Sequence, residues 1–222
     1  MRLIFLFLLF FSHLSFAQDF RQEFDRLKYI QNLENIASYI EEKNDIKFNT
    51  MVLDSSQLAD FLFIDNVSVL SEQHKKHFLI STYTFFMIDK PTLSDKQEPV
   101  CIIAINYNNR QDFLKHANRY SEKLGQKLAN DFVNYALMAH ELGHCLARQT
   151  LGANAISESY ADAIGVFLIK NSPYQEYLTL WINELRNNTG DHNTYMYVKD
   201  YYESIKNVVN LIDALNILKG KK

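Results

Sequence analysis

The chain has 222 residues, 47% of them hydrophobic and 22% charged, with a formal net charge of −3. This length allows one sizeable domain with its own core, and the composition is typical of a soluble globular protein. Nucleic-acid binding requires a clustered basic face, which nothing in this weakly acidic composition suggests, so we expect no nucleic-acid partner. Six Gly and three Pro are few for this length, which favours a mainly helical α+β fold.

The first 17 residues have the pattern of a secretory signal peptide. Arg2 is followed by an apolar run of nine residues, 3–11, and the small residues Ser15 and Ala17 stand at the −3 and −1 positions of a cleavage site. A membrane-spanning helix needs about 20 apolar residues, so we expect cleavage after Ala17 and no stable membrane insertion afterwards. The prediction is an exported protein, periplasmic or secreted, with a single domain over 18–222.

Patterns of apolar residues predict the remaining elements in chain order. A helix is predicted over 19–42, because apolar residues recur there at helical spacing: Phe20, Phe24, Leu27, Ile30, Leu33, Ile36 and Ile40. Strands are predicted over 46–53, 77–88 and 100–107, of which the last is the clearest. A loop is predicted over 90–98, and further helices over 56–63, 111–124, 131–150, 157–170 and 195–218. Asp131 is the predicted cap of the helix that it opens, and Gly152 follows its end.

The chain has two cysteines, Cys101 and Cys145. In an oxidising compartment they could form one disulfide. They could equally remain two buried thiols, because free cysteine packs as a small hydrophobe. A disulfide would tie the helix over 131–150 to the strand over 100–107.

The chemistry of the chain is concentrated in the sequence His140-Glu141-Leu142-Gly143-His144. Residues four apart on a helix lie on one face, so His140 and His144 can bind one tetrahedral zinc ion. Glu141 lies beside them, where it can hold a water molecule and take its proton, but too far round the helix to be a ligand. This is the HExxH signature of zinc hydrolases.

The alternative is a chance match on a surface helix. The residues around the motif are strongly apolar, which indicates a buried helix, and unpaired histidines and a carboxylate in such a helix would cost several kcal/mol. Gly143 costs about 1 kcal/mol inside a helix. Its presence predicts that another element packs closely against the helix at the motif.

A catalytic zinc site needs a third protein ligand, and Glu158 is the predicted one. Glu158 and Asp162 are four residues apart on one face of the next predicted helix. Asp162 would accept the second N–H of a zinc-bound histidine and fix its tautomer. The alternative for Glu158 is a charge that merely favours the N-terminus of its helix.

HELGH followed by ESYAD, within 131–170, resembles the gluzincin class of zinc metallopeptidases and is most similar to the HtpX-like and related periplasmic metalloproteases. The interval from His144 to Glu158 is shorter than in the HtpX-like members. The resemblance implies a zincin-like fold, in which a small sheet lies over the HExxH helix and an edge strand pairs with extended substrate. The strand over 100–107 is the candidate, since an edge strand offers free backbone groups to a peptide.

Gluzincins also use a His, Tyr or Arg that stabilises the oxyanion of the tetrahedral intermediate. His192 is the predicted residue, because it follows Gly190 and precedes the last predicted helix. Tyr195 and Tyr197 are alternatives, and a solvated loop histidine is the other interpretation of His192. The remaining histidines after the signal peptide have no motif around them and are expected to be surface or strand residues: His74, His77 and His116.

The predicted function is therefore an exported zinc-dependent metalloendopeptidase that acts on a peptide or protein substrate. Zn²⁺ is the expected cofactor, held by His140, His144 and Glu158, with Glu141 as general base. Two alternatives belong to other classes: a zinc-dependent amidase of a non-peptide or cell-wall substrate, and a non-catalytic exported binding or assembly protein with a metal-stabilised core. A non-catalytic protein would have no need of Glu141.

Overall fold

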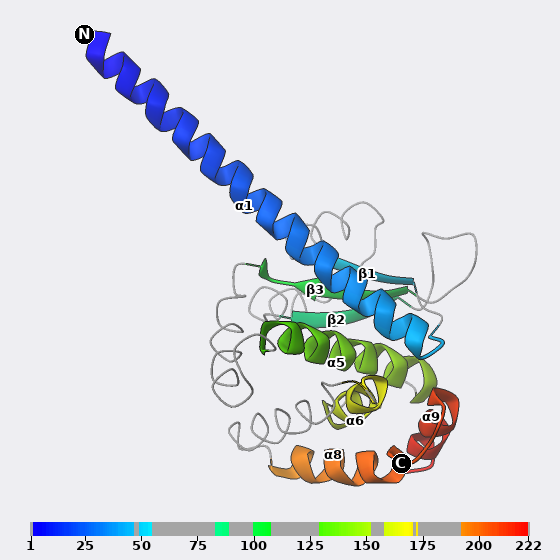
Figure 1. The fold of residues 1–222 in the computed structure, drawn as a ribbon. Coiled ribbons are helices and arrows are strands. Elements are labelled where there is room, and N and C mark those ends of the chain that lie inside the picture. Colours follow the sequence, from blue (N-terminus) through cyan, green and yellow to red (C-terminus); the bar gives the residue numbers. More distant parts are fainter. Residues whose placement is uncertain are drawn as a thin grey trace.

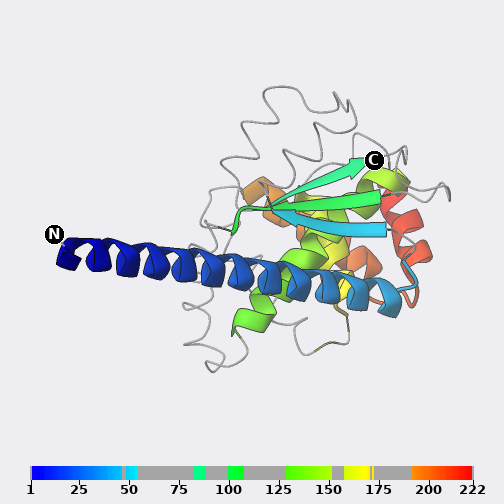
Figure 2. The ribbon, with the colours of Figure 1, turned by 90° about the horizontal axis from the view of Figure 1, so that it is seen from above.

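The computed structural model describes residues 2–46, 49–54, 83–88, 100–107, 129–151, 158–170, 172 and 192–221. Its helices and strands are, in chain order, α1 (Arg2–Lys43), β1 (Asn49–Asp54), β2 (Tyr83–Ile88), β3 (Val100–Ile105), α5 (Ala129–Leu151), α6 (Glu158–Leu168), α8 (His192–Ile205) and α9 (Leu211–Lys219). The sheet, α5, α6 and α8 follow one another as layers from top to bottom of Figure 1. Seen from above, the sheet lies over α5 and α6, and α1 passes alongside β1 (Figure 2). The predicted mainly helical α+β fold, with a small sheet over the HExxH helix, agrees with this arrangement.

The three described strands form one mixed sheet in the order β1-β3-β2. β1 is parallel to β3, with Thr50 opposite Cys101, and β2 is antiparallel to β3. The prediction that 100–107 forms an edge strand is therefore wrong, because β3 is hydrogen-bonded on both sides. The physical reason is visible in its sequence: VCIIAI is a continuous apolar run, and Ile102 and Ile103, on opposite faces, are both fully buried. Such runs are typical of central strands covered on both faces.

The disulfide between Cys101 and Cys145 joins β3 to α5, with an S–S distance of 2.02 Å. Of the two interpretations that the sequence left open, the structure has the disulfide. At the other end of α5, Tyr29 of α1 bridges to Asn134 by a hydrogen bond of 3.0 Å and to Tyr107 by a ring contact. The N-terminal part of α5 therefore lies near the end of β3 and the C-terminal part near its beginning, so the two elements run antiparallel.

Helix α1 begins at Arg2, well before the predicted start at residue 19. Phe24 and Leu27, two of the apolar residues whose spacing predicts the helix, are 59% and 48% exposed, so they do not belong to its buried face. The N-terminal half of α1, before these two residues, extends away from the other elements (Figure 1). Among the described residues, no helix combines the length and the apolar character needed to cross a membrane.

The docked half of α1 carries the predicted core residues from Ile30 to Ile40 and ends in a defined cap. Asp45 has a positive φ of 51°, and the Ile46 N–H donates to the Glu41 carbonyl at 2.9 Å, as in a Schellman motif. The Asn44 amide donates to the Leu168 carbonyl at 3.0 Å. This bond holds the end of α1 against the end of α6 as the chain turns into β1.

Most other predicted elements in the described ranges are present with shifted ends. β1, β2 and α6 overlap the predictions over 46–53, 77–88 and 157–170. Helix α5 begins at Ala129, so Asp131 lies inside its first turn and the prediction that it caps the helix is wrong. The helices predicted over 56–63 and 111–124 and the loop predicted over 90–98 lie outside the described residues.

The single helix predicted over 195–218 is wrong, because the structure has two helices, α8 and α9. Asn210 has an extended backbone and its side chain accepts a hydrogen bond of 2.9 Å from the Asp213 N–H, which caps α9. The Lys170 ammonium donates to the Val208 carbonyl at 2.6 Å. The capping preference of Asn210 and this bond stabilise a turn where helical periodicity alone would continue one helix.

Candidate metal centre

The candidate centre lies where α5 and α6 cross. Gly143 of α5 faces the backbone of Ala161 on α6 so closely that a Cβ at Gly143 would lie 2.5 Å from the Ala161 carbonyl oxygen. The prediction that another element packs against the motif at Gly143 is thus confirmed, and the element is the helix that begins with Glu158. Gly165 lies on the other side of the same crossing and was not predicted as part of it. A glycine inside a predicted helix was the signal that could have found it.

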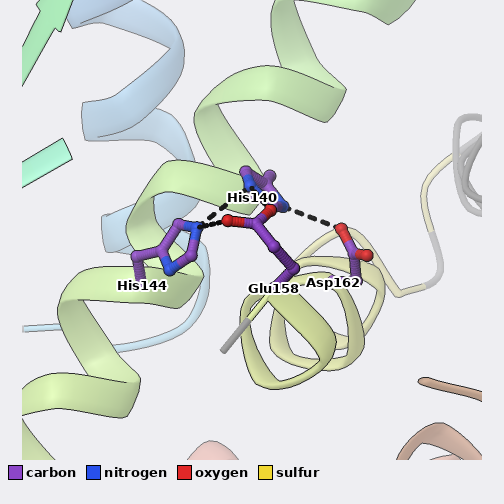
Figure 3. A network of polar contacts seen from close by, with 4 residues as sticks. All are labelled: His140, His144, Glu158 and Asp162. Atoms are coloured by element: carbon purple, nitrogen blue, oxygen red, sulfur yellow. Dashed lines mark hydrogen bonds and ion pairs between the residues drawn. The ribbon is translucent and has the colours of Figure 1, made fainter. Parts of the chain in front are cut away.

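Three side chains from the two helices converge on one point (Figure 3). The Nε2 atoms of His140 and His144 are 3.1 Å apart. The two carboxylate oxygens of Glu158 lie 3.3 Å from His140 Nε2 and 3.4 Å from His144 Nε2. These residues form a group whose ligand atoms all lie within 4.8 Å of one another, so they could hold a metal ion.

The spacing of these donors is of the size that a small tetrahedral metal ion requires. With zinc–nitrogen and zinc–oxygen bonds of about 2.0–2.1 Å, the corners of a tetrahedral site are roughly 3.3 Å apart. The two histidine nitrogens are 3.1 Å apart, while one oxygen of Glu158 lies 3.3 Å from His140 and its other oxygen lies 3.4 Å from His144. Two imidazole nitrogens and a carboxylate oxygen are also a donor set found in catalytic zinc sites, which leave a fourth position open.

Asp162 lies behind His140, on the side away from the donor cluster. Its Oδ1 is 2.8 Å from His140 Nδ1, and its side chain is almost fully buried. A carboxylate at Nδ1 favours the tautomer that carries the proton on Nδ1, which leaves the lone pair on Nε2 for a metal. The arrangement is the one that the spacing of Glu158 and Asp162 predicts, since both project from the same face of α6.

Glu141 lies outside the group of three but within the same buried region. It is only 5% exposed, and its Oε2 has no hydrogen-bond partner among the described residues. A buried carboxylate oxygen without a partner is costly. It fits a site in which this oxygen contacts a water molecule or a substrate.

The electrostatics of the site follow from this geometry. Burial acts to lower the pKa of His140, but its hydrogen bonds with Asp162 and Glu158 outweigh burial and raise the pKa well above 6.5. Burial acts to raise the pKa of Glu158, but its hydrogen bonds with His140 and His144 lower it far below 4.5. Burial raises the pKa of Glu141 despite the opposing effect of the two histidines. In the metal-free site, Asp162 and Glu158 therefore favour the protonated form of His140, and a metal would compete with that proton.

The other predicted site residues cannot be placed beside this centre. His192 is the first residue of α8, and its side chain, like those of Tyr195 and Tyr197, lies outside the described part of the chain. His74, His77 and His116 are also outside the described residues. His192 thus remains a prediction from the sequence.

Comparisons of the chain with protein-family models, with curated proteins and with solved structures found no match. The resemblance to gluzincins therefore rests on the HExxH motif, on the downstream Glu158 and on the geometry that brings them together. What the structure establishes is a mainly helical α+β chain that carries a His-His-Glu group able to hold a metal ion.

Proposed function

We propose that this protein is an exported zinc-dependent metalloendopeptidase of the gluzincin type. The observation that carries the proposal is the meeting of His140, His144 and Glu158, whose ligand atoms all lie within 4.8 Å of one another. They lie next to a buried Glu141 oxygen that has no hydrogen-bond partner among the described residues. A purely structural zinc site is closed by four protein ligands, whereas the described part of the chain offers three, the number that catalytic sites use.

Each residue then has a distinct role. His140, His144 and Glu158 would hold the ion, which when bound lowers the pKa of a water molecule to about 7 and polarises the scissile carbonyl. Glu141 takes the proton of the attacking water and passes it to the leaving amine. In the metal-free protein, burial raises the pKa of Glu141, and its position beside the two histidines suits a general base. His192 is the proposed oxyanion-stabilising residue, with Tyr195 and Tyr197 as alternatives.

The substrate would be an extended peptide that pairs with an edge of the sheet. β3 is excluded by its central position, whereas β2 has β3 on one side and no second strand among the described elements. β2 also packs on α5, the helix that carries the HExxH motif. Backbone pairing with β2 would give binding that tolerates many side chains, since the main-chain hydrogen bonds supply the affinity.

Export is part of the proposal. The signal-peptide pattern over 1–17 predicts a mature chain that begins at Gln18. The disulfide between Cys101 and Cys145 is consistent with an extracytoplasmic protein, because disulfides form and persist in oxidising compartments. A protease that acts outside the cytoplasm would not reach cytoplasmic proteins.

The direct test is the substitution Glu141→Gln in the mature, zinc-loaded protein. We expect cleavage of a peptide library to fall by about 10²–10⁴-fold, the range typical of a lost general base, while the zinc content stays unchanged. Glu42→Gln is the matched control, because Glu42 is an exposed glutamate on α1, and it should keep full activity. Full hydrolysis by zinc-loaded Glu141→Gln would contradict the mechanism. Wild-type protein that binds zinc but cleaves no peptide would contradict the peptidase proposal and favour an amidase or a binding protein.

A further inference from the structure

Two glycines face each other's helices at the crossing of α5 and α6. A Cβ at Gly143 would lie 2.5 Å from the carbonyl oxygen of Ala161 and 3.1 Å from its Cα. A Cβ at Gly165 would lie 3.2 Å from the carbonyl of Ala139 and from the Cα of His140. Every one of these obstacles is a backbone atom, so no side-chain rotation can make room for a methyl group.

The two close contacts lie at the level of the candidate metal centre. Gly143 stands directly before His144, and Ala161 stands directly before Asp162 in the facing helix. Gly165 lies three residues after Asp162 and meets the backbone at His140. Gly143 and Ala161 are therefore immediate neighbours of His144 and Asp162, and the contact of Gly165 falls at Ala139 and His140 themselves. The separation of the two helices at this point determines whether the carboxylate of Glu158 is close enough to the two histidines.

A methyl group at Gly143 would have to push the helices apart by roughly 1 Å before its contact with Ala161 became an ordinary one. Metal sites tolerate errors in ligand distance of about 0.2 Å. His140 and His144 belong to the same helix and would move together, but Glu158 belongs to the other helix. Separation of the helices would thus remove Glu158 from the site and leave the positions of His140 and His144 relative to each other unchanged.

We propose that Gly143 is a positioning residue that acts through Glu158, and that Gly165 supports it from the opposite helix. This inference rests on the proposed zinc site of His140, His144 and Glu158. The glycines touch neither metal nor substrate; they fix the separation of α5 and α6 at which a carboxylate from α6 completes a pair of histidines on α5. The contact at Gly165 is longer, so its role is the weaker of the two.

A double-mutant cycle on zinc affinity separates this role from general destabilisation. The proteins are the full mature chain, Gly143→Ala, Glu158→Gln and the double variant, titrated with zinc against a competing chelator. Substitution of residues that only orient a ligand costs 10–100-fold in metal affinity, so Glu158→Gln should cost at least about 100-fold. We expect Gly143→Ala to cost a similar factor and the double variant to bind no more than a few-fold more weakly than either single variant. In cobalt-substituted protein, the absorption spectrum of Gly143→Ala should match that of Glu158→Gln.

Two further glycine variants provide the controls. Gly165→Ala should show a smaller loss of affinity that is again non-additive with Glu158→Gln, and it keeps the test open if Gly143→Ala does not fold. Gly220→Ala should bind zinc as the wild type does, because a Cβ there would meet atoms only at 3.5 Å and beyond. Wild-type affinity in Gly143→Ala, or losses that add fully in the double variants, would overturn the positioning role and leave the zinc site intact. Wild-type affinity in Glu158→Gln would overturn the proposed ligand set itself.

Discussion

The ionisation of His140 couples the site to pH. In the metal-free protein its pKa is raised well above 6.5 by Asp162 and Glu158, against the effect of burial. A raised histidine pKa contributes folding stability that is fully present below about pH 6.5 and is lost as the pH rises through the raised value. Glu158, whose pKa is lowered, acts in another window, since its contribution is lost only as the pH falls below 4.5.

We therefore expect the stability of the metal-free protein and its affinity for zinc to change in opposite directions with pH. The stability of the metal-free protein should decrease as the pH rises above 6.5, whereas its zinc affinity should increase over the same range, because zinc must displace the proton of His140. Calorimetric zinc titrations in two buffers with different ionisation enthalpies would measure the protons released. Zinc binding at neutral pH without proton release would contradict the raised pKa of His140.

Asp162 is expected to act on zinc through His140. Replacement of Asp162 by Asn keeps the size of the side chain but removes the charge that stands 2.8 Å from Nδ1. We expect zinc affinity to fall by about 10–100-fold, the effect typical of carboxylates behind a metal-bound histidine. Competition with a chromogenic chelator would measure it. Asp200→Asn, an exposed position on α8, is the control and should change nothing; an equal loss in both variants would remove the specific role of Asp162.

Much of the candidate centre could be predicted at the residue scale, because helical spacing determines which side chains share a face. The spacing of His140 and His144 predicted that they share one face of their helix. The spacing of Glu158 and Asp162 predicted the same for the next helix. The sequence could not show that the faces meet, since that depends on the contact of Gly143 with Ala161. The apolar residues around the motif did predict a buried helix, and Glu141 is 5% exposed; which partners its carboxylate has depends on packing by the whole fold.

At the scale of elements, helices and strands were predicted where periodicity is strong, and their ends and neighbours were not. The apolar run of β3 correctly predicted a strand, but its edge position was inferred from a resemblance and not from its pattern. Helical periodicity continued through 206–210, where Asn210 and the bond from Lys170 to Val208 separate α8 from α9. Pairing order and chain breaks of this kind depend on contacts between distant residues, which local patterns do not contain.

The disulfide links two of these elements, β3 and α5, across a sequence separation of 44 residues. A loop of this length, when cross-linked, stabilises the folded state by about 4 kcal/mol in the chain-entropy model. We expect the Cys101→Ala, Cys145→Ala double variant to lose about that much free energy of unfolding, as measured by denaturant titration. Both sulfurs are fully buried, so reductant should reduce the wild type far faster in denaturant than in the native state. A loss below about 1 kcal/mol would contradict the stabilising role.

At the scale of the whole molecule, α1 joins the layers that the site requires. Arg26 lies 3.8 Å from the buried Asp54 at the end of β1. Near the beginning of β1, Thr50 donates a hydrogen bond to Glu41 of α1. Asn44 reaches the end of α6. The docked half of α1 is thereby fixed to the sheet and to the helix that supplies Glu158, while the half that contains the predicted cleavage site after Ala17 extends away from the fold (Figure 1).

The central claim for the whole molecule is that His140, His144 and Glu158 together hold one zinc ion. Zinc K-edge X-ray absorption on the mature protein, with zinc content measured on the same sample, tests it most directly. We predict one zinc per chain after dialysis, with about four nitrogen and oxygen ligands at about 2.0–2.1 Å that include two imidazoles, and a changed spectrum in Glu158→Gln. A wild-type chain that retains no zinc, or a spectrum that Glu158→Gln leaves unchanged, would contradict it.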